Sequence, residues 1–166
     1  MKEHIRNKAG LLSAGSAMAF VVLLGFTSLF SDVTYEGARG AAGQFMQVLG
    51  ASAFAVGVTA GAGELLGYGL RLVSGLIADR TRRYWLMTLM GYAVNLLAVP
   101  ALALVGKWEI AMALLFAERI GKAIRTPSRD AMLSHATSQM GHGFGFGLHE
   151  AMDQIGAFLG LSLIHI

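Results

Sequence analysis

Long apolar segments separated by short polar connections occupy most of the chain. A helix needs about 20 residues to cross the ~30 Å hydrocarbon core of a bilayer. Five segments are expected to span a membrane in this way, and they cover residues 11–30, 48–78, 85–105, 110–124 and 144–166. The fourth is the weakest, because its charge-free part, residues 110–117, is followed by Glu118, Arg119 and Lys122. The pattern predicts an all-α membrane protein with five transmembrane helices.

Two prolines modify this pattern. Pro100 lies inside the third segment and is expected to bend it. Pro127 follows Thr126 in the polar stretch after the fourth segment, an arrangement typical of an N-cap followed by the first residue of a helix. We therefore expect a short surface helix there, within a polar loop of residues 125–143.

The composition supports a membrane protein and excludes several other classes. The 166 residues are 55% hydrophobic and 14% charged, whereas about a quarter of the residues of a soluble domain are charged. The absence of cysteine excludes disulfides and thiolate metal sites. The five histidines form no convincing ligand cluster, and no nucleophile lies at motif spacing from a base. We expect no metal, no cofactor and no enzymatic activity.

Basic residues lie beside the hydrophobic segments, which argues against nucleic-acid binding and gives an orientation. The basic head and first apolar segment imitate a signal peptide, but the segment is longer than an h-region of 7–15 residues, so it is read as an uncleaved span. One side of the predicted membrane path has only Arg39 and Lys107. The other side has Lys2, Arg6, Lys8, Arg80, Arg82, Arg83, Lys122, Arg125 and Arg129. The N-terminus is therefore expected in the cytoplasm, with the chain in the plasma (bacterial inner) membrane.

The connection between the second and third segments, GLIADRTRRYW, contains a glycine followed by an acidic and basic cluster. Its residues are Gly75, Asp79, Arg80, Arg82 and Arg83. This spacing resembles the motif G-x-x-x-D-R-x-G-R-[RK] of the major facilitator superfamily of secondary transporters, with Arg82 in place of the second glycine. In that family the aspartate and arginines hold the cytoplasmic helix ends together, so the resemblance implies a gating motif here.

Two further matches to the same superfamily are partial. Arg119 and Ala123 lie at the spacing of its R-x-x-x-G motif. Gly147, Gly156 and Gly160 lie at the spacing of its antiporter motif G-x8-G-x3-G-P, with Leu161 in place of the proline. The resemblance implies the first five helices of a six-helix N-terminal half. The partner C-terminal half and the rest of that motif are missing, so we expect residues 1–166 to be an incomplete N-terminal transmembrane domain.

Several ionisable residues fall inside the expected spans, where each costs about 2.5–3.5 kcal/mol to insert and usually faces a partner or water. Glu64 and Arg71 are seven residues apart on one helical face, which suits a structural ion pair, a substrate or coupling role, or simple snorkelling toward the membrane surface. The candidates for substrate binding or proton coupling are Asp32, Glu36, Glu64, Arg71, Arg119, Glu150 and Asp153.

The candidate carboxylates differ in expected depth. Asp32 and Glu36 fall toward the outer end of the first segment, so they are either solvated there or part of the site. Asp153 lies about 15 Å into the fifth helix if that helix begins near residue 143. It is therefore expected near mid-membrane, either as a proton or substrate site or as a packing residue, with Arg71 and Arg119 as possible partners.

These features predict a secondary active transporter that moves a small solute by alternating access. Proton-coupled export, or antiport, is the leading form, because intramembrane carboxyls are titratable and the glycine spacing is that of antiporters. A proton-coupled symporter and a non-transporting membrane scaffold or sensor remain as alternatives. The expected partners are the solute, protons and the lipid bilayer.

Overall fold

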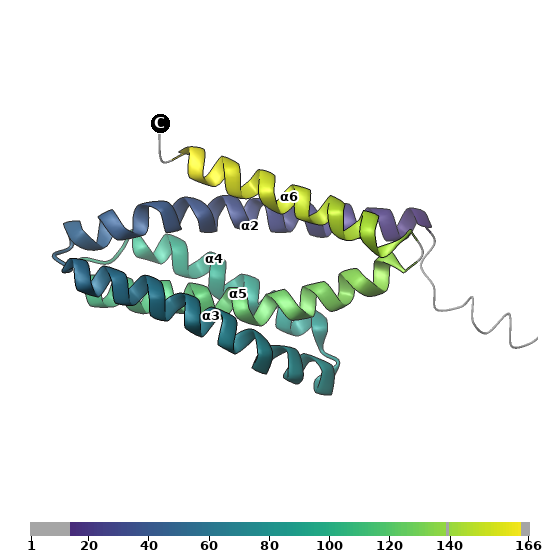
Figure 1. Ribbon diagram of the computed structural model, residues 1–166, viewed down its shortest axis with the longest axis horizontal. Helices are drawn as coiled ribbons and strands as arrows, with labels where there is room; N and C mark the ends of the chain where they lie inside the picture. Colours follow the sequence, from purple (N-terminus) through teal and green to yellow (C-terminus); the bar gives the residue numbers. More distant parts are fainter. Residues whose placement is uncertain (1–13, 139, 164–166) are drawn as a thin grey trace, which may run out of the picture.

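The computed structural model describes residues 14–138 and 140–163 of the chain. These residues form five helices and the short turns that join them (Figure 1). The helices are α2 (Ala14–Val48), α3 (Ala53–Thr81), α4 (Tyr84–Leu102), α5 (Trp108–Thr137) and α6 (His142–Ser162). The expectation of an all-α fold is confirmed. The predicted basic head lies outside the described residues.

Three of these helices are long and apolar enough to cross a membrane: Gly15–Val48 within α2, all of α3 and all of α4. Large apolar side chains also cover much of the outside. On α3 alone, Phe54, Leu65, Leu72 and Leu76 are each more than two-thirds exposed. Monomers in water rarely expose so much contiguous apolar surface, so these faces suit contact with lipid or with another part of a protein.

The first helix extends much further than residues 11–30, the span expected from the sequence. Helix α2 continues through a polar stretch to Val48, because its polar side chains lie on one face and find partners on α5. A short turn follows in which Gly50 has a positive φ of 93°. Ser52 then caps α3 by accepting a hydrogen bond from the Ala55 amide at 3.2 Å.

The expected surface helix after Thr126 is wrong, because α5 runs without interruption from Trp108 to Thr137. The Thr126 hydroxyl does not cap a helix but donates to the Lys122 carbonyl at 2.8 Å. Pro127 has no amide hydrogen and leaves the Ala123 carbonyl without its helical donor. The Ser74 hydroxyl of α3 replaces that donor, at 2.7 Å from the Ala123 oxygen, so the proline is accommodated inside the helix.

The helices pack in pairs around α2 and α5. Helix α6 lies along α2, while α3 and α4 both lie along α5. In Figure 1, α6, α2, α5 and α3 follow one another across the view, and α4 lies behind them. The polar site lies between α2 and α5, where Tyr92 and Asn95 of α4 also make hydrogen bonds.

Glycines set the closest helix contacts. A Cβ on Gly121 of α5 would lie 2.8 Å from the Gly91 carbonyl oxygen of α4, closer than real Cβ atoms approach. On the other side of the fold, a Cβ on Gly160 of α6 would lie 3.0 Å from the Gly37 amide nitrogen of α2. Gly156 packs on the α2 backbone in the same way, so two of the three glycines of the expected antiporter spacing are helix contacts.

Candidate functional site

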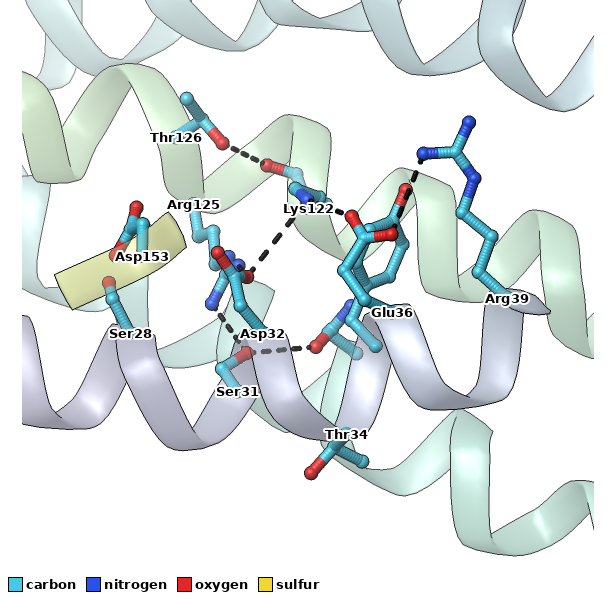
Figure 2. A network of polar contacts seen from close by, with 12 residues as sticks. Ser28, Ser31, Asp32, Thr34, Glu36, Arg39, Lys122, Arg125, Thr126 and Asp153 are labelled. Carbon is cyan, nitrogen blue, oxygen red and sulfur yellow. Dashed lines mark hydrogen bonds and ion pairs between the residues drawn. The ribbon is translucent and has the colours of Figure 1, made fainter. Parts of the chain in front are cut away.

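One face of α2 has a continuous row of polar side chains. They recur every three or four residues, the spacing that places side chains on a single helical face. The row consists of Ser28, Ser31, Asp32, Tyr35, Glu36 and Arg39. Figure 2 shows this face opposite α5, which presents Lys122 and Arg125 to it.

The centre of the site is a buried ion pair between α2 and α5. Arg125 donates to the Asp32 carboxylate at 2.9 Å and to the Ser31 hydroxyl at 2.6 Å. Its guanidinium also lies over the Tyr92 ring of α4, 4.5 Å from the ring centre. The Arg125 side chain is only 1% exposed. The ion pair and the hydrogen bond to Ser31 together compensate part of the cost of burying both charges.

This pair corrects two expectations. Arg125 does not lie in a cytoplasmic loop, since it is part of the continuous α5. Asp32 does not lie toward the outer end of its helix or in water: it is near the midpoint of the 35-residue α2 and is buried. The predicted end of this helix was too early, because hydropathy treats each polar residue by itself and ignores the partners that stabilise it inside the fold.

Lys122 lies one turn before Arg125 and contacts α2 more loosely. Its ammonium is 3.9 Å from a carboxylate oxygen of Asp32 and 3.9 Å from one of Glu36 (Figure 2). It also lies over the Tyr35 ring, 3.6 Å from the ring centre. Both ion-pair distances exceed those of hydrogen bonds. The ammonium is therefore held by charge and by the aromatic face.

A second cluster joins α2, α3 and α5 around Glu64. Its carboxylate accepts from Arg119 at 2.7 Å and from Arg39 at 2.9 Å. Arg119 also donates to the Tyr35 hydroxyl. Arg71, which the sequence suggested as the ion-pair partner of Glu64, does not take that role. Its guanidinium lies over the Tyr68 ring on the same helix. Arg119 replaces it because α3 packs directly on α5.

A cavity of about 500 Å³ opens beside this cluster. Its polar lining is supplied by Tyr35, Arg39, Thr59, Glu64, Glu118 and Arg119. The rest of its wall is small and apolar, formed by residues such as Ala38, Ala42, Gly43, Val56, Ala60 and Leu115. A volume of this size is within the range of small-molecule sites.

Glu118 connects the cavity to the central pair. It is 4% exposed, and its carboxylate accepts from the Asn95 side chain at 2.7 Å. Asn95 in turn accepts from Ser31, which receives the Arg125 hydrogen bond. Glu118 was not among the site residues expected from the sequence. Its position four residues before Lys122 and seven before Arg125 is the signal that it shares their helical face.

Asp153 of α6 lies at the other end of the site. It accepts from Arg129 of α5 at 2.9 Å, and the same arginine donates to Ser28 at 3.1 Å. The His149 ring nitrogen is 3.5 Å from the other Asp153 oxygen. The expected partners Arg71 and Arg119 are wrong, because Arg129 lies in α5 beside α6 rather than in a loop. Glu150 is exposed and accepts from Gln154, outside these contacts.

The expected gating motif lies at the turn between α3 and α4. Asp79 is exposed and accepts a hydrogen bond from the Tyr84 hydroxyl at 3.3 Å. Arg82 ends α3 with a left-handed φ of 53°, and its amide donates to the Ala78 carbonyl at 2.7 Å. Arg80 and Arg83 are exposed at this turn. Gly75 lies one turn before Asp79 and packs against Pro127 of α5.

The site thus combines cations, most of them from α5, with carboxylates, most of them from α2, α3 and α6. This arrangement suits binding of charged groups or transfer of protons between carboxylates. Asp32, Glu64 and Arg119 each take part in more than one ion pair. Breaking one of these ion pairs therefore alters the neighbouring pair that shares the same residue. Among the residues that the structure describes, no group of three or more His, Cys, Asp or Glu side chains is placed to bind a metal ion.

Comparison with known proteins gives relatives but no family model and no significant match to a solved structure. An uncharacterized protein of Mycobacterium tuberculosis (strain H37Rv) is 50% identical over 145 residues, which are 87% of this chain and 36% of that protein. An uncharacterized protein of Mycobacterium bovis matches to the same extent.

A more distant relative has a descriptive name. An uncharacterized MFS-type transporter of Methanocaldococcus jannaschii is 32% identical over 148 residues, 88% of this chain and 37% of that protein. The chain therefore spans little more than a third of the length of the curated relatives it matches. The chain is therefore similar to a protein whose name describes it as a transporter, and its apolar helices suggest a membrane location.

Proposed function

We propose that the chain is the N-terminal part of a secondary active transporter of the major facilitator superfamily. The similarity to the archaeal MFS-type transporter covers 88% of the chain. The Gly75 to Arg83 motif spans the last turns of α3 and the turn that joins it to α4, two membrane-length helices. In this proposal all five helices span the membrane, and a C-terminal half, contributed by further sequence, faces α2 and α5.

The observation that carries the proposal is the buried ion pair of Asp32 and Arg125 near the middle of α2. Charged groups at this depth are costly in a membrane and usually mark a substrate or ion pathway. The adjoining pairs of Lys122, Arg119 and Arg129 extend along the same face. A scaffold needs no such row, so its presence favours transport over the non-transporting alternative.

We further propose that transport is coupled to protons and runs as export. Asp153 contacts Arg129 and His149, so proton binding to its carboxyl would release Arg129 to another partner. Uptake by proton symport uses the same groups and is the nearest alternative. Arg80 in the last turn of α3 and the two arginines of the turn that follows are at the end of the bundle where α2 begins (Figure 1). From the positive-inside rule we propose that this end, with the N-terminus, lies in the cytoplasm of a bacterial inner membrane.

The direct test uses the full-length protein that includes this chain, reconstituted in liposomes with a pH-sensitive dye inside. A pH gradient is imposed, and a panel of small cationic, anionic and neutral solutes is added in turn. Proton-coupled transport predicts that at least one solute class changes the internal pH faster than in protein-free liposomes. A folded protein with no response to any class would support the scaffold alternative.

A further inference from the structure

The groups around the Lys122 ammonium are arranged like a binding site for an ammonium ion. Its nitrogen is equidistant, at 3.9 Å, from carboxylate oxygens of Asp32 and Glu36, and lies 3.6 Å from the centre of the Tyr35 ring. An aromatic face combined with acidic groups is the usual environment of a bound ammonium ion. We call these three side chains, Asp32, Tyr35 and Glu36, the ammonium cage.

The cage holds Lys122 much less firmly than the neighbouring pocket holds Arg125. Arg125 makes hydrogen bonds of 2.6 and 2.9 Å and is 1% exposed. The Lys122 side chain is 21% exposed, and its ammonium makes contacts beyond hydrogen-bond range. A lysine ends in a point charge on a flexible four-carbon stem, so Lys122 is able to leave the cage without breaking the Asp32–Arg125 pair.

We propose that the cage binds the ammonium group of the transported solute, an organic cation with an apolar body, and that Lys122 occupies the cage when the solute is absent. The inference rests on the proposed transport function and specifies its substrate class. The apolar body has a place beside the cage, because Tyr35 also lines the cavity of about 500 Å³ with its apolar walls.

The surrounding charges favour a cation over an anion. An anionic group in the cage would meet the carboxylates of Asp32 and Glu36 directly, with Glu64 and Glu118 lining the adjoining cavity. The nearby guanidiniums are already engaged: Arg125 with Asp32 and Arg119 with Glu64. Displacement of Lys122 by a solute ammonium exchanges one cation for another, so the charge of the site is preserved.

The test measures binding of n-butylammonium chloride, a copy of the lysine stem and head, to the purified full-length protein by thermal shift at constant ionic strength. Lys122→Ala opens the cage, and we expect it to bind this probe at least tenfold more tightly than the wild type. Lys122→Met leaves an apolar stem in place and should give no such gain. The matched control is Lys107→Ala, which removes an exposed lysine at the start of the same helix and should behave as wild type.

A second measurement needs no variant. Acetic anhydride labels accessible lysines, and n-butyltrimethylammonium, which cannot react with it, serves as the cation. We expect this cation to increase acetylation of Lys122 severalfold, measured by mass spectrometry, with Lys107 unchanged.

The proposal is overturned if Lys122→Ala gains no affinity for n-butylammonium, if Lys122 labelling is unchanged or falls, or if sodium acetate binds the wild type and loses its binding in Lys122→Ala. The last result would identify an anion site. These readouts do not depend on transport: a protein that binds alkylammonium ions but moves no solute contradicts the proposed function, whereas one that transports without such binding contradicts only the cage.

Discussion

Arg125 of α5 and Asp32 of α2 form a 2.9 Å ion pair that is almost completely buried between the two helices. Removing one partner of such a pair leaves an uncompensated buried charge, so we expect Asp32→Asn to lower the free energy of unfolding by about 3–5 kcal/mol. Thermal unfolding in detergent measures this effect. Glu150→Gln, the same loss of charge at an exposed position, is the control and should change stability little.

The double variant Asp32→Asn/Arg125→Met separates pairing from other effects. Because neither charge then remains buried, its loss of stability should be smaller than the sum of the two single losses. Strict additivity would show that the two side chains do not depend on each other.

Ser74 of α3 compensates for Pro127 of α5, which is a second interaction that links two helices. The Ser74 hydroxyl supplies the hydrogen bond to the Ala123 carbonyl that Pro127 cannot supply. Ser74→Ala should therefore cost about 1–3 kcal/mol, the cost of an unsatisfied buried carbonyl. In a Pro127→Ala background the helix has its own donor again, and the same substitution should cost clearly less.

Thr34→Ala is the matched control for Ser74→Ala. Thr34 also donates to a carbonyl, that of Phe30 at 3.0 Å, but there the helix has its own amide donor. Equal losses for Ser74→Ala with and without Pro127 would contradict the assigned role of this hydroxyl.

Arg82 takes the left-handed conformation that ends α3. An L-residue pays about 1–2 kcal/mol there, whereas glycine pays almost nothing. We expect Arg82→Gly to raise the free energy of unfolding by about 1 kcal/mol, part of that strain being offset by greater freedom of the unfolded chain. Arg80→Gly, inside the last turn of the same helix, should instead destabilise by about 1 kcal/mol. A loss of stability in both variants would argue against strain at Arg82.

Asp79 is expected to act as a gate residue. Its carboxylate accepts from Tyr84 at the start of α4, and any further contact with an arginine or a helix end of the other half depends on its charge. In the full-length protein, Asp79→Asn should change the transport rate several-fold while insertion remains normal. Labelling of single cysteines near the cytoplasmic side should rise as well, and unchanged labelling with an unchanged rate would exclude a gate.

Uninterrupted apolar runs with charged ends were predictable from the sequence. The second and third segments, expected at residues 48–78 and 85–105, correspond closely to α3 and α4, because hydropathy and the charges at Arg80 to Arg83 mark their ends. Helices α2 and α5 were predicted too short. The polar residues of each helix are stabilised by partners on the other helix. A hydropathy scale applied to a single segment does not include contacts between helices.

The candidate site was predictable in part. The structure brings Asp32, Glu36, Glu64, Arg119 and Asp153 onto the faces that meet α5, α2 or both, while Arg71 and Glu150 lie outside these contacts. The partners Lys122, Arg125 and Arg129 were assigned to the cytoplasmic side as evidence for orientation. Together with Glu118 they are spaced at intervals of three and four residues, which is the spacing of one helical face. The prediction missed this because Pro127 was interpreted as the start of a separate helix.

We propose that this row of ion pairs couples solute movement to protons. Asp153 is the residue at which coupling can be separated from transport. In Asp153→Asn the carboxyl can no longer exchange a proton, and Arg129 loses its partner on α6. Exchange of solute for solute requires no net proton release. Glu150→Gln, on the same helix but exposed, is the matched control.

The most direct measurement is the ratio of gradient-driven solute transport to solute exchange, per folded protein, in liposomes containing the full-length Asp153→Asn variant. We expect gradient-driven transport to fall at least tenfold while exchange stays within about twofold of the wild type, with Glu150→Gln normal in both. Gradient-driven transport at the wild-type rate, or a parallel fall of both activities, would contradict the proposed coupling.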